Sequence, residues 1–200
     1  MSPPGPFPPD SALVNRARTG DESAFVDLLL RHQDRIYASV LRFCGNAEDA
    51  REITQRAFIN AWRRIKDFKG DCAFTTWMYR IAFNESVTFR REEGRRRTVS
   101  MQRREDGQVP EPVDDRRPEE RMEGEEGRRK VQEALNQLDP EERKILILKE
   151  LEDRSYDEIA EILEIPKGTV RSRLFRAREA LREKLRVLMG TPASRANSGN

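Results

Sequence analysis

The stretch SYDEIAEILEIPKGTVRSRLFRAREALREKL, residues 155–185, decides which fold this chain adopts. It opens with Ser155 and, three residues later, Glu158, which is the pattern of a capping box at a helix N-terminus. Apolar residues then recur at helical spacing until a short turn at residues 164–166, and a longer helix follows. Two helices joined by so short a turn are typical of a helix-turn-helix.

The net charge reverses at this turn. Residues 139–164 contain ten acidic and four basic side chains, whereas residues 166–189 contain eight basic and two acidic ones. Such a concentration of positive charge on one helix is typical of an element that faces a polyanion. The sequence therefore predicts a helix-turn-helix whose second helix binds DNA. A basic helix face that contacts only water is the alternative interpretation.

The second helix of this motif has distinct inner and outer sides. At about 100° per residue, Val170, Leu174 and Ala177 fall together and are expected to face the core, while Phe175 points away from it. An exposed aromatic ring between arginines suits the major groove, where apolar side chains contact thymine methyl groups and arginine pairs with guanine. The residues predicted to contact duplex DNA are Thr169, Arg171, Ser172, Arg173, Phe175 and Arg176.

The flanking sequence sets the limits of this C-terminal domain, which we place at residues 128–189. Upstream, Asp139-Pro-Glu-Glu is a helix start, with aspartate at the cap and proline at the first helical position. Residues 98–127 lack apolar periodicity and contain several prolines, which predicts a flexible linker. Residues 190–200 are small and polar and are expected to be disordered.

Residues 10–97 are predicted to form a second helical domain. Apolar residues recur every three or four positions from Phe25 to Cys44 and again from Ala50 to Ile65, which predicts two amphipathic helices, with a third helix to follow. Between the first two, Gly45-Asn46 suits a helix end and the next cap. Residues 1–9 are rich in proline and are expected to be disordered. The predicted fold class is all-α, with two small helical domains joined by a flexible linker.

The composition argues against several classes of protein. The chain has no run of about 18 apolar residues, so no membrane insertion is expected. The N-terminus also lacks the basic and apolar segments of a signal peptide, and we expect a cytoplasmic protein. Cys44 and Cys72 lie far apart and His32 is the single histidine, so no metal site, cofactor or catalytic triad is expected. Nothing in the sequence predicts an enzyme.

The motifs at both ends of the chain resemble one family. The C-terminal domain is similar to region 4 of the extracytoplasmic-function (ECF) sigma factors of the sigma-70 family, in Asp139-Pro-Glu-Glu, Tyr156-Asp-Glu-Ile-Ala-Glu-Ile-Leu163 and Gly168-Thr-Val-Arg-Ser-Arg-Leu-Phe-Arg-Ala-Arg-Glu-Ala-Leu181. The N-terminal domain resembles region 2, in Asp49-Ala50, Gln55, Phe58, Ala61-Trp62, Phe68-Lys-Gly-Asp71 and Phe74-Thr-Thr-Trp77-Met-Tyr-Arg-Ile-Ala-Phe-Asn84. The two regions occur in the family's order.

The resemblance implies a role for each part of the chain. The second helix would dock on the clamp helices of the polymerase β′ subunit through Asp49, Glu52, Gln55, Arg56 and Phe58. The third helix and the loop before it would bind the unstacked strand of the promoter −10 element through Phe68, Trp77, Tyr79, Arg80, Phe83 and Asn84. The C-terminal helix-turn-helix would bind the −35 element, and its domain would contact the β flap of the polymerase.

By this resemblance, the chain is an alternative sigma factor. It would bind core RNA polymerase, direct initiation at particular promoters, assist DNA melting and serve a stress response. An inhibitory anti-sigma partner is also expected. The chain departs from the family at Arg56, where an acidic residue is usual.

Two alternatives stay open from the sequence. A repressor or response regulator can carry the same helix-turn-helix, but it would bring a receiver, ligand-binding or dimerisation domain, and residues 10–97 show no strand pattern or acidic phosphorylation pocket. Trp77 lies on an apolar stripe and could belong to the core. Tyr79 and Phe83 project from the polar side of the third helix, where they could stack on bases or pack between the domains.

Overall fold

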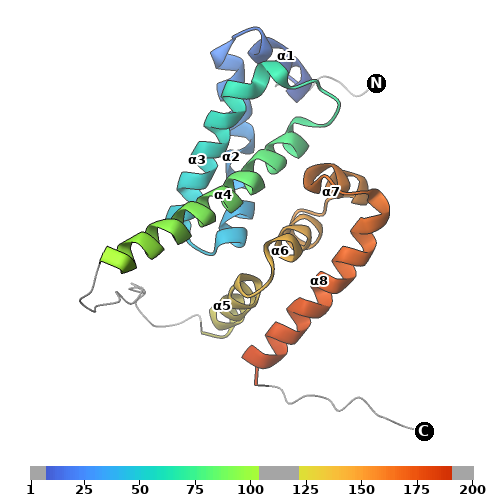
Figure 1. The fold of residues 1–200 in the computed structure, drawn as a ribbon. Helices are drawn as coiled ribbons and strands as arrows, with labels where there is room; N and C mark the ends of the chain where they lie inside the picture. Colours follow the sequence, from blue (N-terminus) through green and yellow to red (C-terminus); the bar gives the residue numbers. More distant parts are fainter. Residues whose placement is uncertain (1–7, 104–121, 191–200) are drawn as a thin grey trace.

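The computed structural model of the chain describes residues 8–103 and 122–190. This part of the chain is helical and contains no strand, as predicted. Figure 1 shows two groups of helices packed against each other, α1–α4 and α5–α8. In chain order the elements are α1 (Asp10–Arg18), α2 (Glu22–Cys44), α3 (Ala47–Arg64), the 3-10 turn η1 (Ile65–Asp67), α4 (Phe74–Arg103), α5 (Met122–Asn136), α6 (Pro140–Leu146), the π-helical turn η2 (Ile147–Leu151), α7 (Tyr156–Leu163) and α8 (Lys167–Leu188).

The N-terminal bundle is built around α2, which packs against α1, α3 and α4. As predicted, α2 ends at Gly45, whose φ of 76° is left-handed, and Asn46 caps α3 by accepting hydrogen bonds from two backbone N–H groups of its first turn. His32 is buried at the edge of this core, and its Nε2 lies 2.8 Å from Asp10 Oδ2. The single histidine therefore ties α1 to α2.

Both helices that flank the predicted linker extend into it. α4 runs to Arg103 rather than ending at residue 97, and α5 begins at Met122 rather than at residue 128. Loss of apolar periodicity marks where a helix leaves its bundle, and an exposed helix can continue without an apolar face. In α5, an ion pair between Lys130 Nζ and Glu126 Oε1 at 2.8 Å joins residues one turn apart and stabilises the helix.

Several of the predicted disordered or flexible segments fall outside the described residues. These are residues 104–121 of the linker, residues 1–7 of the N-terminal tail and residues 191–200 of the C-terminal tail. The flexibility of these segments stays a prediction.

Capping interactions define the helices of the C-terminal bundle. Asp139 caps α6, with Pro140 at the first helical position, as predicted. At the start of α7, the Glu158 N–H donates to Ser155 Oγ at 3.2 Å and the Ser155 N–H donates to Glu158 Oε2 at 2.9 Å. This is the predicted capping box. α7 ends at Leu163, its C-cap Glu164 has a left-handed φ of 54°, and Pro166 precedes α8, so the helix-turn-helix lies where the sequence predicts it.

The π-helical turn η2 changes the direction of the side chains between α6 and α7. A π-turn accommodates one more residue than the α-helical turn it replaces. Asp153, shortly after it, has a left-handed φ of 46°. Between these two features lies Glu152, whose side chain is turned toward the N-terminal bundle and is only 9% exposed.

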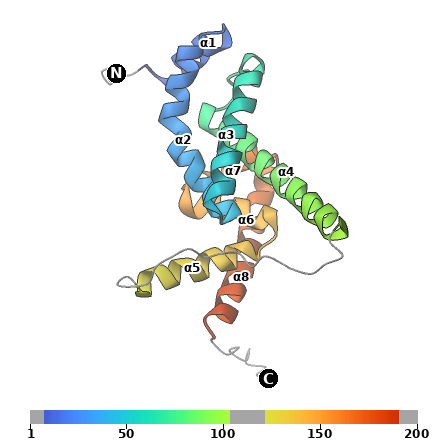
Figure 2. The ribbon, with the colours of Figure 1, turned by 90° about the vertical axis from the view of Figure 1, so that its left-hand side faces the viewer.

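The two bundles share a core instead of packing separately. Their buried apolar residues form one cluster, with α5 and η2 against α2 and with α7 against α4. Figure 2 shows the same two groups of helices in contact from a second side. At this junction the guanidinium of Arg143 is buried and donates to the carbonyl oxygens of Phe43 and Asn136, both at 2.6 Å. Burial, aided by repulsion from Arg90, lowers the pKa of Arg143 to about 10.

Removing the capping box should weaken the helix-turn-helix. We expect Ser155→Ala to lower the free energy of unfolding by about 1 kcal/mol, because the first turn of α7 loses its side-chain acceptor. Urea unfolding followed by far-UV circular dichroism measures this. Thr88→Ala is the matched control, because Thr88 is exposed on α4 and its hydroxyl bonds only within that helix. Equal stability of the two variants would contradict the role of the cap.

Candidate nucleic-acid and protein interfaces

The first three turns of α8 have one buried side and one open side. Val170, Leu174 and Ala177 are buried, where α8 packs on α6 and α7. Phe175 points the other way and is 64% exposed, which is unusual for a phenylalanine and typical of a contact surface. The structure brings all six predicted duplex contacts together here. Thr169 and Arg173 are half-buried, and the exposed members are Arg171, Ser172, Phe175 and Arg176.

Ion pairing divides the arginines of α8 into two groups. Those in its C-terminal half are paired, as between Arg178 Nη2 and Glu150 Oε1 at 2.6 Å. The same holds for the pairs Arg182–Glu179 and Arg186–Glu183. Within the described ranges, the N-terminal half has three arginines with no carboxylate at ion-pair distance: Arg171, Arg173 and Arg176. Positive charge without an internal counterion therefore gathers where the exposed aromatic ring lies.

Two of the predicted −10 contacts belong to the interior of the N-terminal bundle. Phe68 and Trp77 are 4% and 8% exposed, and their ring centroids lie 4.8 Å apart. Phe74 completes this aromatic cluster, 6.0 Å from Trp77. In this arrangement neither ring offers a face to a nucleic-acid base, and the core alternative describes Trp77.

Tyr79 and Phe83 lie on another side of α4, where Glu152 of the C-terminal bundle contacts Tyr79 and Phe43 of α2 contacts Phe83. They are 0% and 2% exposed, so in this arrangement the packing alternative describes them better than stacking on bases. Their rings stack with centroids 6.1 Å apart, and the guanidinium of Arg154 lies 4.9 Å from the Tyr79 ring. A helical wheel shows this side as polar because it takes no account of the other domain, which contacts α4 there through Tyr79 and Arg80.

The remaining two predicted −10 contacts differ in exposure. Arg80 faces the C-terminal bundle: its Nη2 donates to the carbonyl oxygen of Glu161 at 2.7 Å, and its Nη1 lies 3.5 Å from Glu164 Oε1. Asn84, about one turn further along α4, is exposed. Of the six residues, Asn84 is therefore the one on an open surface.

The five predicted docking residues of α3 also differ in exposure. Glu52 and Gln55 are exposed and Asp49 is half-buried, so these three present a polar surface. Phe58 is 4% exposed, so its ring does not protrude as a contact. Arg56 is half-buried and has partners within the chain.

A band of polar contacts joins α3 to α4 around Arg56. Its guanidinium donates to Glu52 Oε1 at 2.6 Å and to Glu92 Oε2 at 3.0 Å. Glu85, to which the sequence assigns no role, lies 3.8 Å from Arg56 and accepts a hydrogen bond from Asn60 Nδ2 at 2.8 Å. The departure from the family at this position therefore gives α3 an internal ion-pair network with α4.

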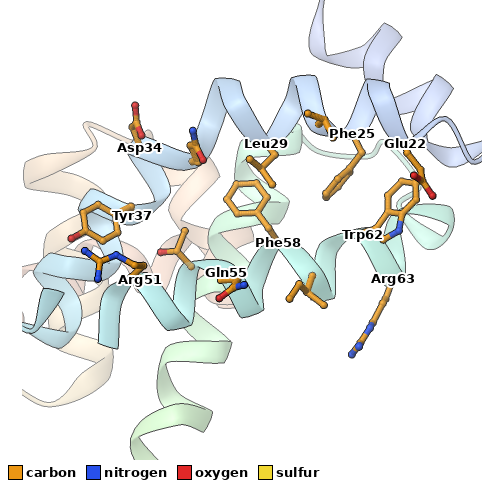
Figure 3. A pocket seen from close by; sticks show the side chains of 14 residues that line it. Glu22, Phe25, Leu29, Asp34, Tyr37, Arg51, Gln55, Phe58, Trp62 and Arg63 are labelled. Atoms are coloured by element: carbon orange, nitrogen blue, oxygen red, sulfur yellow. The ribbon is translucent and has the colours of Figure 1, made fainter. Parts of the chain in front are cut away.

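A groove of about 830 Å³ lies between α2 and α3 (Figure 3). Phe25 and Leu29 of α2 and Phe58 and Trp62 of α3 form its apolar floor, and the rings of Phe25 and Trp62 lie 5.0 Å apart. The two edges carry opposite charge. Glu22 and Asp34 lie along α2, and Arg51 and Arg63 lie along α3.

The sequence does not reveal this groove, because its lining residues lie on the stripes predicted to be core. The signal that could have found it is the excess of apolar residues on α2. Val26, for example, lines the groove and remains 50% exposed. Such excess indicates a helix that lacks cover on one side.

The described residues give no sign of metal or membrane chemistry. Within 8–103 and 122–190, no three His, Cys, Asp or Glu side chains are grouped to hold a metal ion. In the same ranges, no helix has the length and apolar character that a membrane span requires. Cys44 is half-buried and its Sγ donates to the Val40 carbonyl at 3.0 Å, which fits the packing role predicted for it. Burial raises the pKa of both the Cys44 and Cys72 thiols.

Comparison with known proteins identifies both domains. The Sigma-70 region 2 model matches residues 28–96 and the Sigma-70 region 4 model matches residues 128–181. The RNA polymerase sigma-H factor of Pseudomonas aeruginosa is 40% identical over 184 residues, covering 90% of this chain and 95% of that protein. The ECF RNA polymerase sigma-E factor of Escherichia coli K12 is 38% identical over 186 residues, covering 90% and 96%.

Two solved structures share the fold. CnrH, solved with the cytosolic domain of CnrY, has a TM-score of 0.65 and 23% identity, covering 92% of this chain and 99% of that one. The sigma factor RpoE, solved with the anti-sigma factor NepR from Bartonella quintana, has a TM-score of 0.61 and 24% identity, covering 82% and 97%.

The family models match both bundles in the expected order, and the identity to sigma-E and sigma-H factors extends over nine-tenths of the sequence. The chain therefore belongs to the ECF sigma factors of the sigma-70 family, which are transcription initiation factors and not enzymes.

Proposed function

We propose that this alternative sigma factor divides its work among three surfaces. The groove between α2 and α3 binds core RNA polymerase, the N-terminal half of α8 recognises the −35 duplex, and α4 binds the melted −10 strand. The observation that carries the proposal is the open side of α8, where an exposed Phe175 lies among arginines that have no ion-pair partner in the part of the chain that the structure describes. A structural helix would gain nothing from that combination.

The groove suits an amphipathic helix of the polymerase. Apolar anchors from a partner helix can fill its floor, as in other helix-in-groove complexes. The opposite charges on the two edges would fix the direction of that helix. We assign the groove to the clamp helices of β′, with Glu52 and Gln55 as polar contacts beside it. Arg56 is left out of this surface because its guanidinium is held by carboxylates of the chain itself.

A charge placed in the groove should prevent docking. Ile59 lines the groove and is 44% exposed, so Ile59→Asp should fold normally. We expect at least about tenfold weaker binding to core polymerase, about 1.4 kcal/mol, because docking would bury an unpaired carboxylate. Fluorescence anisotropy of labelled protein titrated with core polymerase measures the affinity.

Leu30→Asp is the matched control for this substitution. Leu30 is on α2, is 60% exposed and does not line the groove. It should bind core polymerase like the unaltered protein. Equal affinities of the two variants would place the docking surface elsewhere.

The open side of α8 has the chemistry of a major-groove reader. Arginine donates two hydrogen bonds to guanine, and an aromatic ring contacts the thymine methyl group. Phosphate contacts from the flanking half-buried residues would fix the register without specifying sequence. We assign Arg171, Ser172, Phe175 and Arg176 to base edges, and Thr169 and Arg173 to the DNA backbone.

Arg176→Ala should weaken binding to the −35 duplex by about 5- to 150-fold, the equivalent of about 1–3 kcal/mol for one bidentate pair. The duplexes are those that holoenzyme selects from a random pool, and gel-shift titration measures the change. Arg182→Ala is the matched control on the same helix, because Arg182 is paired with Glu179. If Arg182→Ala caused the same loss, α8 would act through charge alone.

The −10 surface on α4 includes Asn84, which is open, Tyr79 and Arg80, which the C-terminal bundle contacts, and Phe83, which is buried against the Tyr79 ring. Bases of a melted strand stack on aromatic rings at about 1–3 kcal/mol each. Phe68 and Trp77 would act on this surface only indirectly, by packing inside the bundle and holding α4 in place.

Three further assignments follow from the family. The C-terminal domain would contact the β flap, the protein would act in the cytoplasm with the polymerase, and an anti-sigma protein would hold it inactive until a stress signal arrives. Reconstitution tests the whole proposal against a repressor. Core polymerase with this chain should start transcription at a selected promoter, whereas a repressor would bind duplex DNA without core polymerase.

A further inference from the structure

The contact between the two bundles covers one of the three proposed surfaces and leaves the other two open. Tyr79 and Phe83 are buried, and Arg80 is bonded to the end of α7. In contrast, Phe175 on α8 is exposed, and the lining of the groove comes from α2 and α3 alone. The closed arrangement therefore blocks the −10 surface selectively.

A single carboxylate holds this contact at its centre. Glu152 Oε2 accepts hydrogen bonds from the Tyr79 hydroxyl at 2.6 Å and from Arg35 Nε at 2.7 Å. Its other oxygen accepts from Ser39 Oγ at 2.5 Å, and its backbone carbonyl accepts from Arg35 Nη2 at 3.2 Å. One residue of the C-terminal bundle thus binds two helices of the N-terminal bundle, α2 and α4.

Glu152 stays ionised in this position. Burial pushes the pKa of its carboxyl group upward, but the hydrogen bonds from Ser39, Tyr79 and Arg35 outweigh burial and keep the pKa below its ordinary value. A buried carboxylate with three donors forms strong, directional contacts. Its loss would leave the buried Tyr79 hydroxyl without its acceptor, which is costly, whereas Ser39 Oγ would keep the Arg35 carbonyl oxygen at 3.1 Å.

Other polar groups at the contact between the bundles make fewer hydrogen bonds than Glu152 does. Arg154 lies over the Tyr79 ring, where a stacking base would lie, yet its Nε and Nη2 atoms are buried with no hydrogen-bond partner among the described residues. The Nε atoms of Arg80 and Arg143 are in the same state. Each such donor opposes closure, because water would satisfy it in an open state. These features fit a contact that opens.

We propose that Glu152 is a latch that holds the two domains closed and so controls access of single-stranded DNA to Tyr79 and Phe83. The proposal rests on the assignment of these two rings to the −10 strand. Because the strand binds only the open state, its apparent affinity falls in proportion to the open fraction. Docking on polymerase and recognition of the −35 duplex use surfaces that closure leaves uncovered.

The first experiment opens the latch. Glu152→Ala is compared with Glu150→Ala, which removes a neighbouring glutamate whose partner, Arg178, lies in its own bundle. Fluorophores on cysteines at Arg64 and Val187, both exposed and one in each bundle, report the separation of the bundles by energy transfer, with Cys44→Ala and Cys72→Ser in all proteins. Binding is measured with a fluorescent pool of random single-stranded 12-mers.

Glu152→Ala should lower the energy transfer and strengthen single-strand binding by at least about threefold, as the open fraction rises. Glu150→Ala should match the parent protein in both measurements. Unchanged energy transfer in Glu152→Ala would overturn the latch itself. Lower energy transfer with unchanged strand binding would overturn the control of strand access, and it would do so by showing that the covered face of α4 is not the −10 surface.

The second experiment fixes the closed state. A Cβ atom on Gly45 would lie 2.7–3.2 Å from side-chain atoms of Asn136, so these two positions adjoin across the bundles and are the ones chosen for a cysteine pair. In the Cys44→Ala, Cys72→Ser background, oxidised Gly45→Cys/Asn136→Cys should lose at least about tenfold in single-strand affinity, and dithiothreitol should restore it. Its binding to core polymerase should persist. Equal strand binding by the oxidised and reduced forms would overturn the proposal.

Discussion

Helix α2 carries more apolar surface than any one neighbouring helix can cover. Because burial of apolar area is the main favourable contribution to folding, such a helix gathers partners on several sides. α2 contacts α1, α3 and α4 within its own bundle, and α5 and η2 of the other bundle. One side still lacks full cover, and there Phe25 and Leu29 line the groove. The shared core, the contact between the bundles and the proposed polymerase site thus arise from the same excess of apolar surface.

The parts of the structure that the sequence predicts well are those that depend on near neighbours. Gly45, Asn46 and Ser155 act within one turn of their own position, so their residue types suffice to place helix ends. The prediction of the inner and outer sides of α8 likewise depends only on the spacing of residues within that helix. Tyr79 and Phe83 show the opposite case, because a helical wheel cannot distinguish a side that faces water from a side that another domain covers. Arg56 likewise acquires its partners from α4, far along the chain.

The contact between the bundles is rich in arginine, which distinguishes it from the apolar core of either bundle. Arg143 keeps its charge at neutral pH although burial lowers its pKa to about 10, and it uses that charge to bond carbonyl oxygens at the ends of α2 and α5. Buried polar contacts of this kind add little net stability for the desolvation they require, but their direction selects one arrangement. The shared apolar core therefore holds the bundles together, and the hydrogen bonds orient them.

Because of the π-helical turn η2, the direction of the Glu152 side chain depends on the number of residues in this segment as well as on the residue type at position 152. A helix without the extra residue would turn the following side chains by about 100°. A relative with one residue fewer between the caps at Asp139 and Ser155 could keep a glutamate here and still point it away from α2 and α4. The spacing of two caps, readable from sequence alone, would then separate sigma factors that close on themselves from those that stay open.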